Sequence, residues 1–121
     1  MKIGVVLVTY NRVDMLRNTL ELYENQTKKP DYIVVLNNHS TDSTGELLAT
    51  WEATPSAIKH YVITTESNLG GSGGFNKALE YAQELDAEWI WIVDDDAYPT
   101  ESCLEELDRF AQPDIEKERT L

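Results

Sequence analysis

The stretch WIVDDDAYP, Trp91 to Pro99, is the part of the sequence that most strongly indicates the fold. The run of tryptophan and β-branched residues from Trp89 to Val93 is too short for an independent helix and predicts a strand buried on both faces. Asp94, Asp95 and Asp96 follow directly, at the expected carboxyl end of this strand. Open α/β sheets bind ligands at that edge, and crowded carboxylates suit a hard divalent cation. The alternative is an acidic turn that only caps the next helix.

Three further apolar runs precede this strand, and a segment with helical spacing of apolar residues follows each strand. We expect strands at Ile3–Val8, Tyr32–Leu36, His60–Thr65 and Trp89–Val93, and helices containing Val13–Tyr23, Leu47–Trp51, Phe75–Leu85 and Leu104–Ala111. Asn11 is expected to cap the first helix, and Ser43 and Glu46 have the spacing of a capping box at the second. Four strand–helix repeats predict an α/β domain: a Rossmann-like parallel sheet with helices on both faces.

The composition is that of one folded domain with little affinity for nucleic acid. The 121 residues are 41% hydrophobic, and a formal net charge of −12 argues against nucleic acid or an anionic membrane as a partner. No stretch reaches the roughly 20 apolar residues of a transmembrane segment. The single cysteine, Cys103, excludes an intrachain disulfide and is interpreted as a packing residue, which fits a cytoplasmic location. Attachment at the inner face of the membrane through a further segment stays open.

Four loops converge at the carboxyl edge of such a sheet, because all parallel strands end there. These loops are residues 9–12, 37–42, 68–76 and 94–98. The tri-aspartate and the glycine cluster Gly70–Gly74 share this edge, which favours a ligand site. The glycines lack the spacing of a P-loop or a dinucleotide fingerprint. They allow close approach of the backbone to a ligand, or else a flexible connection or close packing of the third helix.

Motifs in the four loops resemble one enzyme family. VTYNR after the first strand, NNHSTDST after the second, NLGGSGGFNKA after the third and DDD after the fourth are similar to the nucleotide-sugar half of family 2 glycosyltransferases, which have the GT-A fold. The resemblance covers Met1 to about Phe110, and the GGxGGF form is most similar to rhamnosyl- and galactofuranosyltransferase-like members. It implies metal-dependent, inverting transfer of a sugar from a UDP- or dTDP-sugar to a glycan acceptor in polysaccharide or cell-wall synthesis, with Mn²⁺ or Mg²⁺ as cofactor.

The resemblance also implies roles for residues at matching positions. The donor-binding residues would be Thr9, Tyr10, Asn11, Arg12, Asn37, Asn38, Asn68, Gly71, Asn76, Asp94 and Asp95, and the metal ligands would be Asp96 and Asp94. Tyr10 would stack on a uracil or thymine base, Asp95 would face the sugar, and Asp96 would hold the metal that bridges both phosphates. Asn37 stands where many members have aspartate, and its amide oxygen can still accept a hydrogen bond from the base.

The resemblance places the catalytic base beyond this chain, in an acceptor half that follows the donor half. We therefore expect residues 1–112 to be the donor-binding domain and residues 113–121 to be a charged tail at the start of a missing acceptor half. Such a chain is a fragment that need not turn over alone, and Asp114, Glu116 and Glu118 are poor candidates for the base. Apolar surface exposed at a sheet edge or on the last helix would allow homo-oligomers to form.

Two other functions stay open from the sequence. A non-catalytic nucleotide-sugar binding module would have the same site without a base or an acceptor groove. A Mg²⁺-dependent aspartyl phosphatase or receiver-like domain also carries clustered aspartates after a strand, although those folds usually place the key acid after the first strand. Among the remaining candidates, His39 is interpreted as a solvated loop residue, His60 as structural, and Trp51, Trp89 and Trp91 as core.

Overall fold

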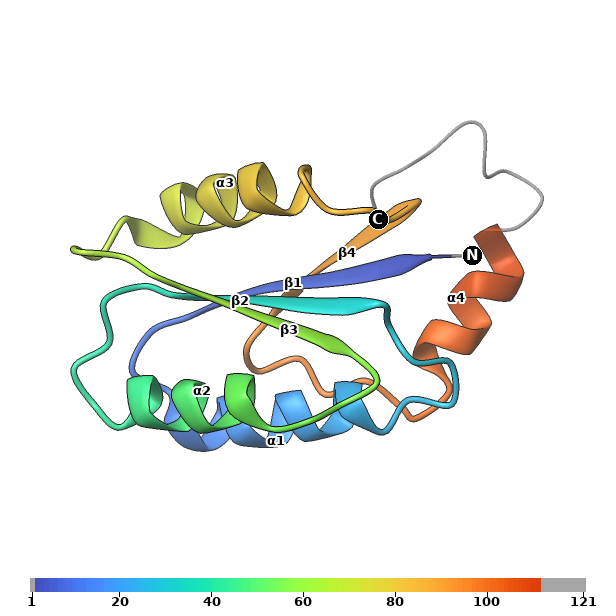
Figure 1. Ribbon diagram of the computed structural model, residues 1–121, viewed down its shortest axis with the longest axis horizontal. Coiled ribbons are helices and arrows are strands. Elements are labelled where there is room, and N and C mark those ends of the chain that lie inside the picture. The colour runs from blue at the N-terminus through green and yellow to red at the C-terminus, as the bar shows by residue number, and fades with distance from the viewer. Residues whose placement is uncertain (1, 112–121) are drawn as a thin grey trace.

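A four-stranded parallel sheet forms the centre of the computed structural model, which describes residues 2–111 (Figure 1). The elements are β1 (Ile3–Thr9), α1 (Val13–Glu24), β2 (Tyr32–Asn37), α2 (Thr44–Ala53), β3 (Lys59–Thr64), α3 (Gly70–Ala82), β4 (Trp89–Asp94) and α4 (Cys103–Ala111). The strand order is β3-β2-β1-β4, and every neighbouring pair is parallel. The α/β class and the parallel sheet are confirmed. The expected charged tail, residues 113–121, lies outside the described residues.

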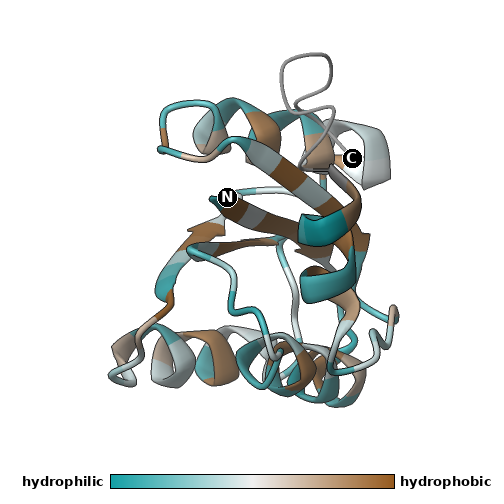
Figure 2. Ribbon diagram, turned by 90° about the vertical axis from the view of Figure 1, so that its right-hand side faces the viewer, coloured by the Kyte–Doolittle hydropathy of each residue, from teal (hydrophilic) through white to brown (hydrophobic). Residues whose placement is uncertain are grey.

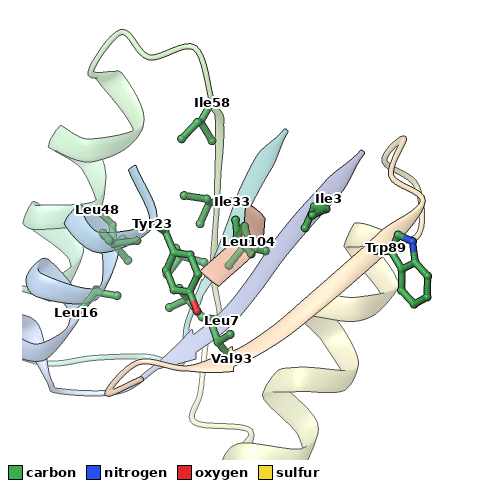
Figure 3. Close-up of a cluster of buried hydrophobic side chains, with 13 residues drawn as sticks. Ile3, Leu7, Leu16, Tyr23, Ile33, Leu48, Ile58, Trp89, Val93 and Leu104 are labelled. Atoms are coloured by element: carbon green, nitrogen blue, oxygen red, sulfur yellow. The ribbon is translucent and has the colours of Figure 1, made fainter. Parts of the chain in front are cut away.

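Helices cover both faces of the sheet, as predicted. α1 and α2 lie on one face and α3 on the other (Figure 1). β1 contributes Ile3, Val5 and Leu7 to the core cluster on the first face, which also contains Tyr23 of α1. Figure 3 shows the Tyr23 ring beside Leu7. Ala78 of α3 belongs to the core of the second face. Two helical layers explain why the central strands β1 and β2 are largely apolar, and the hydropathy colouring shows the hydrophobic residues gathered in the strands (Figure 2).

The edge strand β4 is more exposed than predicted. The sequence predicts Trp89–Val93 as buried on both faces, whereas only Trp89 and Val93 of this run are fully buried and the residues between them are partly buried. The reason is position, since β4 has no neighbour on its outer side within residues 2–111. At the other edge, Glu52 of α2 accepts a hydrogen bond from the Val62 backbone at 3.1 Å and covers one amide of β3. Self-association through the exposed apolar surface stays a prediction.

Two expectations about helix caps are wrong. Asn11 does not cap α1: it has a φ of 49°, the N-cap is Arg12, and the Asn11 side chain accepts a hydrogen bond from the Asp42 backbone at 3.2 Å. Ser43 is the N-cap of α2 but makes no side-chain cap bond, and Asp42 accepts from the Thr44 backbone at 2.9 Å instead. A bond between the two neighbouring loops therefore takes up the Asn11 side chain at α1, and the residue before Ser43 supplies the bond at the start of α2.

α3 begins earlier than the sequence predicts. Gly70 to Gly74 belong to the helix and not to a loop, and Gly70 starts it with a φ of 74°. Gly74 faces the sheet, where an added Cβ would lie 3.0 Å from Val8 and 3.3 Å from Asn38. The close packing considered as an alternative for the glycines therefore holds at Gly74. An added Cβ at Gly71 would meet nothing within 4 Å, so Gly71 faces open space.

His60 is structural, as expected. Its ring stacks on Trp51 with centroids 3.9 Å apart, and its Nδ1 lies 2.9 Å from the Trp51 carbonyl oxygen. Its Nε2 contacts the carboxylate of Glu24, which is 36 residues away and therefore not apparent from the sequence. His39 is exposed in its loop, also as expected. The tryptophans belong to the core cluster or pack against it: Trp51, Trp89 and Trp91. None of the described helices is long and apolar enough to cross a membrane.

Two buried tyrosines make the fold sensitive to alkaline pH. Burial raises the pKa of Tyr23 to about 12, and burial with the nearby Asp31 raises the pKa of Tyr32 to about 12, from an ordinary value of 10.0. Because the folded state favours the neutral phenol, the stability present below pH 10 is lost as the pH rises toward 12. Between pH 10 and pH 12, we expect the ionisation of each tyrosine to lower the free energy of unfolding by about 2–3 kcal/mol.

Urea unfolding between about pH 9 and pH 12 checks this expectation in the wild type, Tyr32→Phe and a control, Tyr98→Phe. Tyr32→Phe should keep its fold, because the Tyr32 hydroxyl is buried and has no hydrogen-bond partner within residues 2–111. It should lose less stability at high pH than the wild type. Tyr98 is 56% exposed, so Tyr98→Phe should follow the wild type. Equal losses in all three proteins would contradict the prediction.

Candidate functional site

A pocket of about 460 Å³ lies at the carboxyl edge of the sheet. It is lined by Val8, Thr9, Tyr10, Arg12, Asn38, Asn68, Gly70, Gly71, Phe75, Asp94, Asp95 and Asp96. The segments that follow all four strands therefore meet in one place, as the parallel topology predicts. Most of the predicted site residues are brought together here. Asn11, Asn37 and Asn76 are not among the residues that line the pocket.

These three asparagines have other positions. Asn37 is 2% exposed, and its side-chain oxygen accepts a hydrogen bond from the Ser40 backbone at 3.0 Å. Asn11 accepts a hydrogen bond from the Thr41 backbone at 2.7 Å, which joins the loop after β1 to the loop after β2. Asn76 is exposed on α3. Asn11 and Asn37 thus shape the loops that carry the pocket.

Asn38 ties the loop after β2 to the beginning of α3. Its side chain donates a hydrogen bond to the Gly70 carbonyl at 3.0 Å and accepts one from the Leu69 backbone at 2.8 Å. The Asn68 side-chain oxygen accepts a hydrogen bond from the Gly70 backbone amide at 2.8 Å. The first turn of α3 is therefore held at the rim of the pocket. A helix N-terminus in this position favours a bound anion such as a phosphate group.

Asp95 joins three segments of the chain in the wall of the pocket. It is 5% exposed, and its carboxylate accepts a hydrogen bond from the Thr9 hydroxyl at 2.9 Å and lies 3.3 Å from Arg12 Nη1. Its carbonyl oxygen accepts a hydrogen bond from the Thr19 hydroxyl of α1 at 2.7 Å. Burial raises the pKa of Asp95, although Thr9 and Arg12 act in the opposite direction. The residue expected to face the sugar is thus largely enclosed by protein.

Asp94 and Asp96 are the exposed carboxylates of the pocket, on either side of the buried Asp95. The Asp96 side chain is 49% exposed and lies 3.5 Å from Arg12 Nη1. Within residues 2–111, no three histidine, cysteine or acidic side chains form a closed metal site. Mg²⁺ and Mn²⁺ do not need one, because they commonly bind one or two carboxylates and take their other ligands from substrate phosphates and water. Two open carboxylates beside a pocket fit such an ion.

Three residues line the pocket without having been predicted as individual site residues. Val8 is near the end of β1 and packs against the core beneath α3. Gly70 and Phe75 reach the pocket because α3 starts earlier than expected. The sequence assigns Phe75 to the apolar face of a helix that begins there. The signal that could have placed it is the glycine-rich segment before it, residues 70–74, once that segment is taken as helical.

Comparison with known proteins gives a family match over most of the chain. Residues 4–114 match the family described as glycosyl transferase family 2. Galactofuranosyltransferase GlfT1 of Mycolicibacterium smegmatis is 35% identical over 99 residues, which are 82% of this chain and 31% of that protein. The poly(ribitol-phosphate) beta-glucosyltransferase of Bacillus spizizenii is 35% identical over 101 residues, which are 81% of this chain and 15% of that protein. The chain thus spans less than a third of either relative.

Solved structures agree with the fold. S. aureus TarS 1–349 in complex with UDP-GlcNAc has a TM-score of 0.78 and 26% identity, and covers 93% of this chain, which spans 32% of that protein. The mannosyltransferase PcManGT of Pyrobaculum calidifontis, in complex with GDP-Man and Mn²⁺, has a TM-score of 0.69 and 24% identity. The match covers 79% of this chain and 28% of PcManGT, and it supports the fold alone. The predicted GT-A fold is confirmed.

Proposed function

Because this chain belongs to glycosyl transferase family 2, we propose that its pocket binds the nucleotide diphosphate sugar from which the whole protein transfers a sugar to an acceptor hydroxyl. The observation that supports this most is the meeting of an exposed tyrosine, a helix N-terminus and two open carboxylates in one pocket. The chemistry of these groups matches the base, the diphosphate and the charge of such a donor. The family assignment favours transfer over the phosphatase-like or receiver-like alternative.

Each part of the pocket has a proposed role. Tyr10 is 44% exposed and would stack on the base, and Asp94 would contact the ribose. The first turn of α3 and the Arg12 guanidinium would bind the diphosphate. Asp96, with Asp94, would hold Mn²⁺ or Mg²⁺. When bound, such an ion supplies positive charge that stabilises the departing diphosphate.

The transfer itself needs a group beyond the pocket. The acceptor oxygen would attack the anomeric carbon with inversion, the bond to the diphosphate would break, and a carboxylate base from the acceptor half would take the hydroxyl proton. The names of the relatives, a galactofuranosyltransferase and a poly(ribitol-phosphate) beta-glucosyltransferase, support a glycan acceptor in polysaccharide synthesis. Because such a donor would be made in the cytoplasm, the reaction would take place on the cytoplasmic side, at the inner face of the membrane.

Calorimetric titration of the 121-residue chain with UDP and dTDP in the presence of Mn²⁺ tests the proposal. UDP is the first probe because TarS has been solved with UDP. Tyr10→Ala should weaken UDP binding about tenfold, because stacking of a base on an aromatic ring contributes about 1–3 kcal/mol. The matched control is Tyr98→Ala, which removes another exposed tyrosine that does not line the pocket and should leave binding unchanged. Failure of the wild type to bind either nucleotide would overturn the proposal.

A further inference from the structure

Within residues 2–111, Arg12 is the single basic side chain among those that line the donor pocket. Its Nη1 lies 3.3 Å from a carboxylate oxygen of Asp95 and 3.5 Å from one of Asp96, and Asp94 directly precedes this pair in the chain. The formal net charge of the whole chain is −12. One guanidinium therefore supplies the local positive charge for three consecutive carboxylates in the free protein.

The two contacts of Arg12 are unequal. The Asp95 side chain is 8% exposed and is also held by the Thr9 hydroxyl at 2.9 Å. The Asp96 side chain is 49% exposed, and its contact with Arg12 is the longer one. Water screens an exposed ion pair far more than a buried one. The contact with Asp96 is consequently the weaker of the two and the first to break.

The main chain at Arg12 is fixed while its side chain has room to move. Asn11, the residue before it, has a φ of 49° and is bonded to Thr41 and Asp42 in the neighbouring loop. The Arg12 carbonyl accepts a hydrogen bond from the Leu16 backbone at 2.9 Å, which anchors the first turn of α1. The Arg12 side chain is 51% exposed. Its guanidinium can therefore change partners without a movement of the backbone.

We propose that Arg12 is an exchangeable counter-cation of the donor site: it bridges Asp95 and Asp96 in the free protein, and releases Asp96 to the metal when the donor binds. Arg12 would keep Asp95 and turn its free nitrogen atoms to the diphosphate. This inference rests on the proposed function. The physical reason is that two cations repel each other at Asp96 unless an anion lies between them. A diphosphate supplies that anion, and a guanidinium suits phosphate oxygens.

The exchange makes metal binding and nucleotide binding cooperative. Without nucleotide, a metal ion must displace Arg12 from Asp96 and leave the guanidinium without a second partner. With nucleotide, the diphosphate provides the new partner, so the metal binds more tightly. A positive charge that stays in one place would change the affinity for the metal and the affinity for the nucleotide separately. It would not change the factor by which one ligand alters the affinity for the other. The coupling therefore distinguishes an exchanging arginine from a merely charged one.

The test measures the Mn²⁺ affinity of wild type, Arg12→Gln and Arg17→Gln, with and without saturating UDP. Arg12→Gln should bind Mn²⁺ alone about threefold more tightly, because an exposed competing ion pair is gone. The gain in Mn²⁺ affinity on adding UDP should fall about tenfold, because the charged contact with the diphosphate is lost. Arg17 is the matched control: it pairs with Asp14 at 3.1 Å on α1, does not line the pocket, and its loss makes the same change in net charge.

A second measurement uses the unaltered protein and stays decisive even if Arg12→Gln does not fold. The NMR signals of the Arg12 guanidinium should shift when UDP and Mg²⁺ are added together. Unchanged signals, or equal coupling in wild type and a folded Arg12→Gln, would overturn the exchange while leaving the proposed donor site intact. Failure of the wild type to bind UDP with Mn²⁺ would overturn the proposed function and the exchange together.

Discussion

Replacing Asp96 with asparagine is expected to remove the Mn²⁺-dependent part of UDP binding, a loss of about a hundredfold in affinity. Asparagine has nearly the same shape but lacks the negative charge that a hard cation needs. Because the Asp96 side chain is 49% exposed, the substitution should leave the fold intact. The lost contact with Arg12 is exposed and contributes at most about 1 kcal/mol to stability. Titration of wild type and variant with UDP, with and without Mn²⁺, measures the effect.

The control for Asp96→Asn is Asp86→Asn, which makes the same change in net charge at another place. The Asp86 side chain is 82% exposed, pairs with Lys2 and does not line the donor pocket. It should bind UDP and Mn²⁺ as the wild type does. If Asp96→Asn kept the full dependence on Mn²⁺, Asp96 would not be a metal ligand, and the assignment would pass to Asp94. Asp94→Asn in the same titration decides between the two.

Replacing Gly4 with alanine is expected to lower the free energy of unfolding by about 3 kcal/mol. A Cβ at this position would lie 2.0 Å from Cζ of Tyr32 and 2.3 Å from its hydroxyl oxygen. Gly4 and Tyr32 are paired across β1 and β2, so the ring lies directly over the glycine. The ring has little freedom to move, because Tyr32 is 3% exposed and Tyr61 packs edge-on against it with centroids 6.3 Å apart.

Urea unfolding at neutral pH measures this loss, and Gly71→Ala provides the opposite case. An added Cβ at Gly71 would meet nothing within 4 Å, so alanine in α3 should raise the stability by up to about 1 kcal/mol through its higher helix propensity. The double variant Gly4→Ala with Tyr32→Leu should recover part of the loss, because the smaller side chain makes room for the methyl group. Unchanged stability of Gly4→Ala would show that the Tyr32 ring can move aside.

The sequence predicts the sheet and the location of the site because both depend on long apolar runs. β1 and β2 are buried along almost their entire length between two helical layers, which produces an uninterrupted hydrophobic signal. Parallel strands must then end at one edge, so Thr9, Asn38 and the three aspartates could be brought together from their order alone. The same signal cannot distinguish the central strands from the edges, which is why β4 was predicted to be fully buried.

Details that depend on contacts between loops were not predictable. The glycines before Phe75 have low helix propensity, yet they start α3 because Asn38 binds Leu69 and Gly70 from the neighbouring loop. Asn11 looks like a helix cap in sequence, but the loop after β2 offers its side chain other partners. Three identical aspartates also give no indication of which one is buried. The hydroxyl of Thr9 and the guanidinium of Arg12 select Asp95.

The two hydrogen bonds of Asn38 also define how this fold can be recombined with its relatives. Residue 38 and the segment 68–71 behave as one unit for loop grafting, since the Leu69 amide and the Gly70 carbonyl depend on a side chain from another loop. A chimera that imports the glycine segment without an amide at position 38 would lose both of these hydrogen bonds. Productive crossovers should therefore exchange both segments together, with their junctions inside β2 and after the first turns of α3.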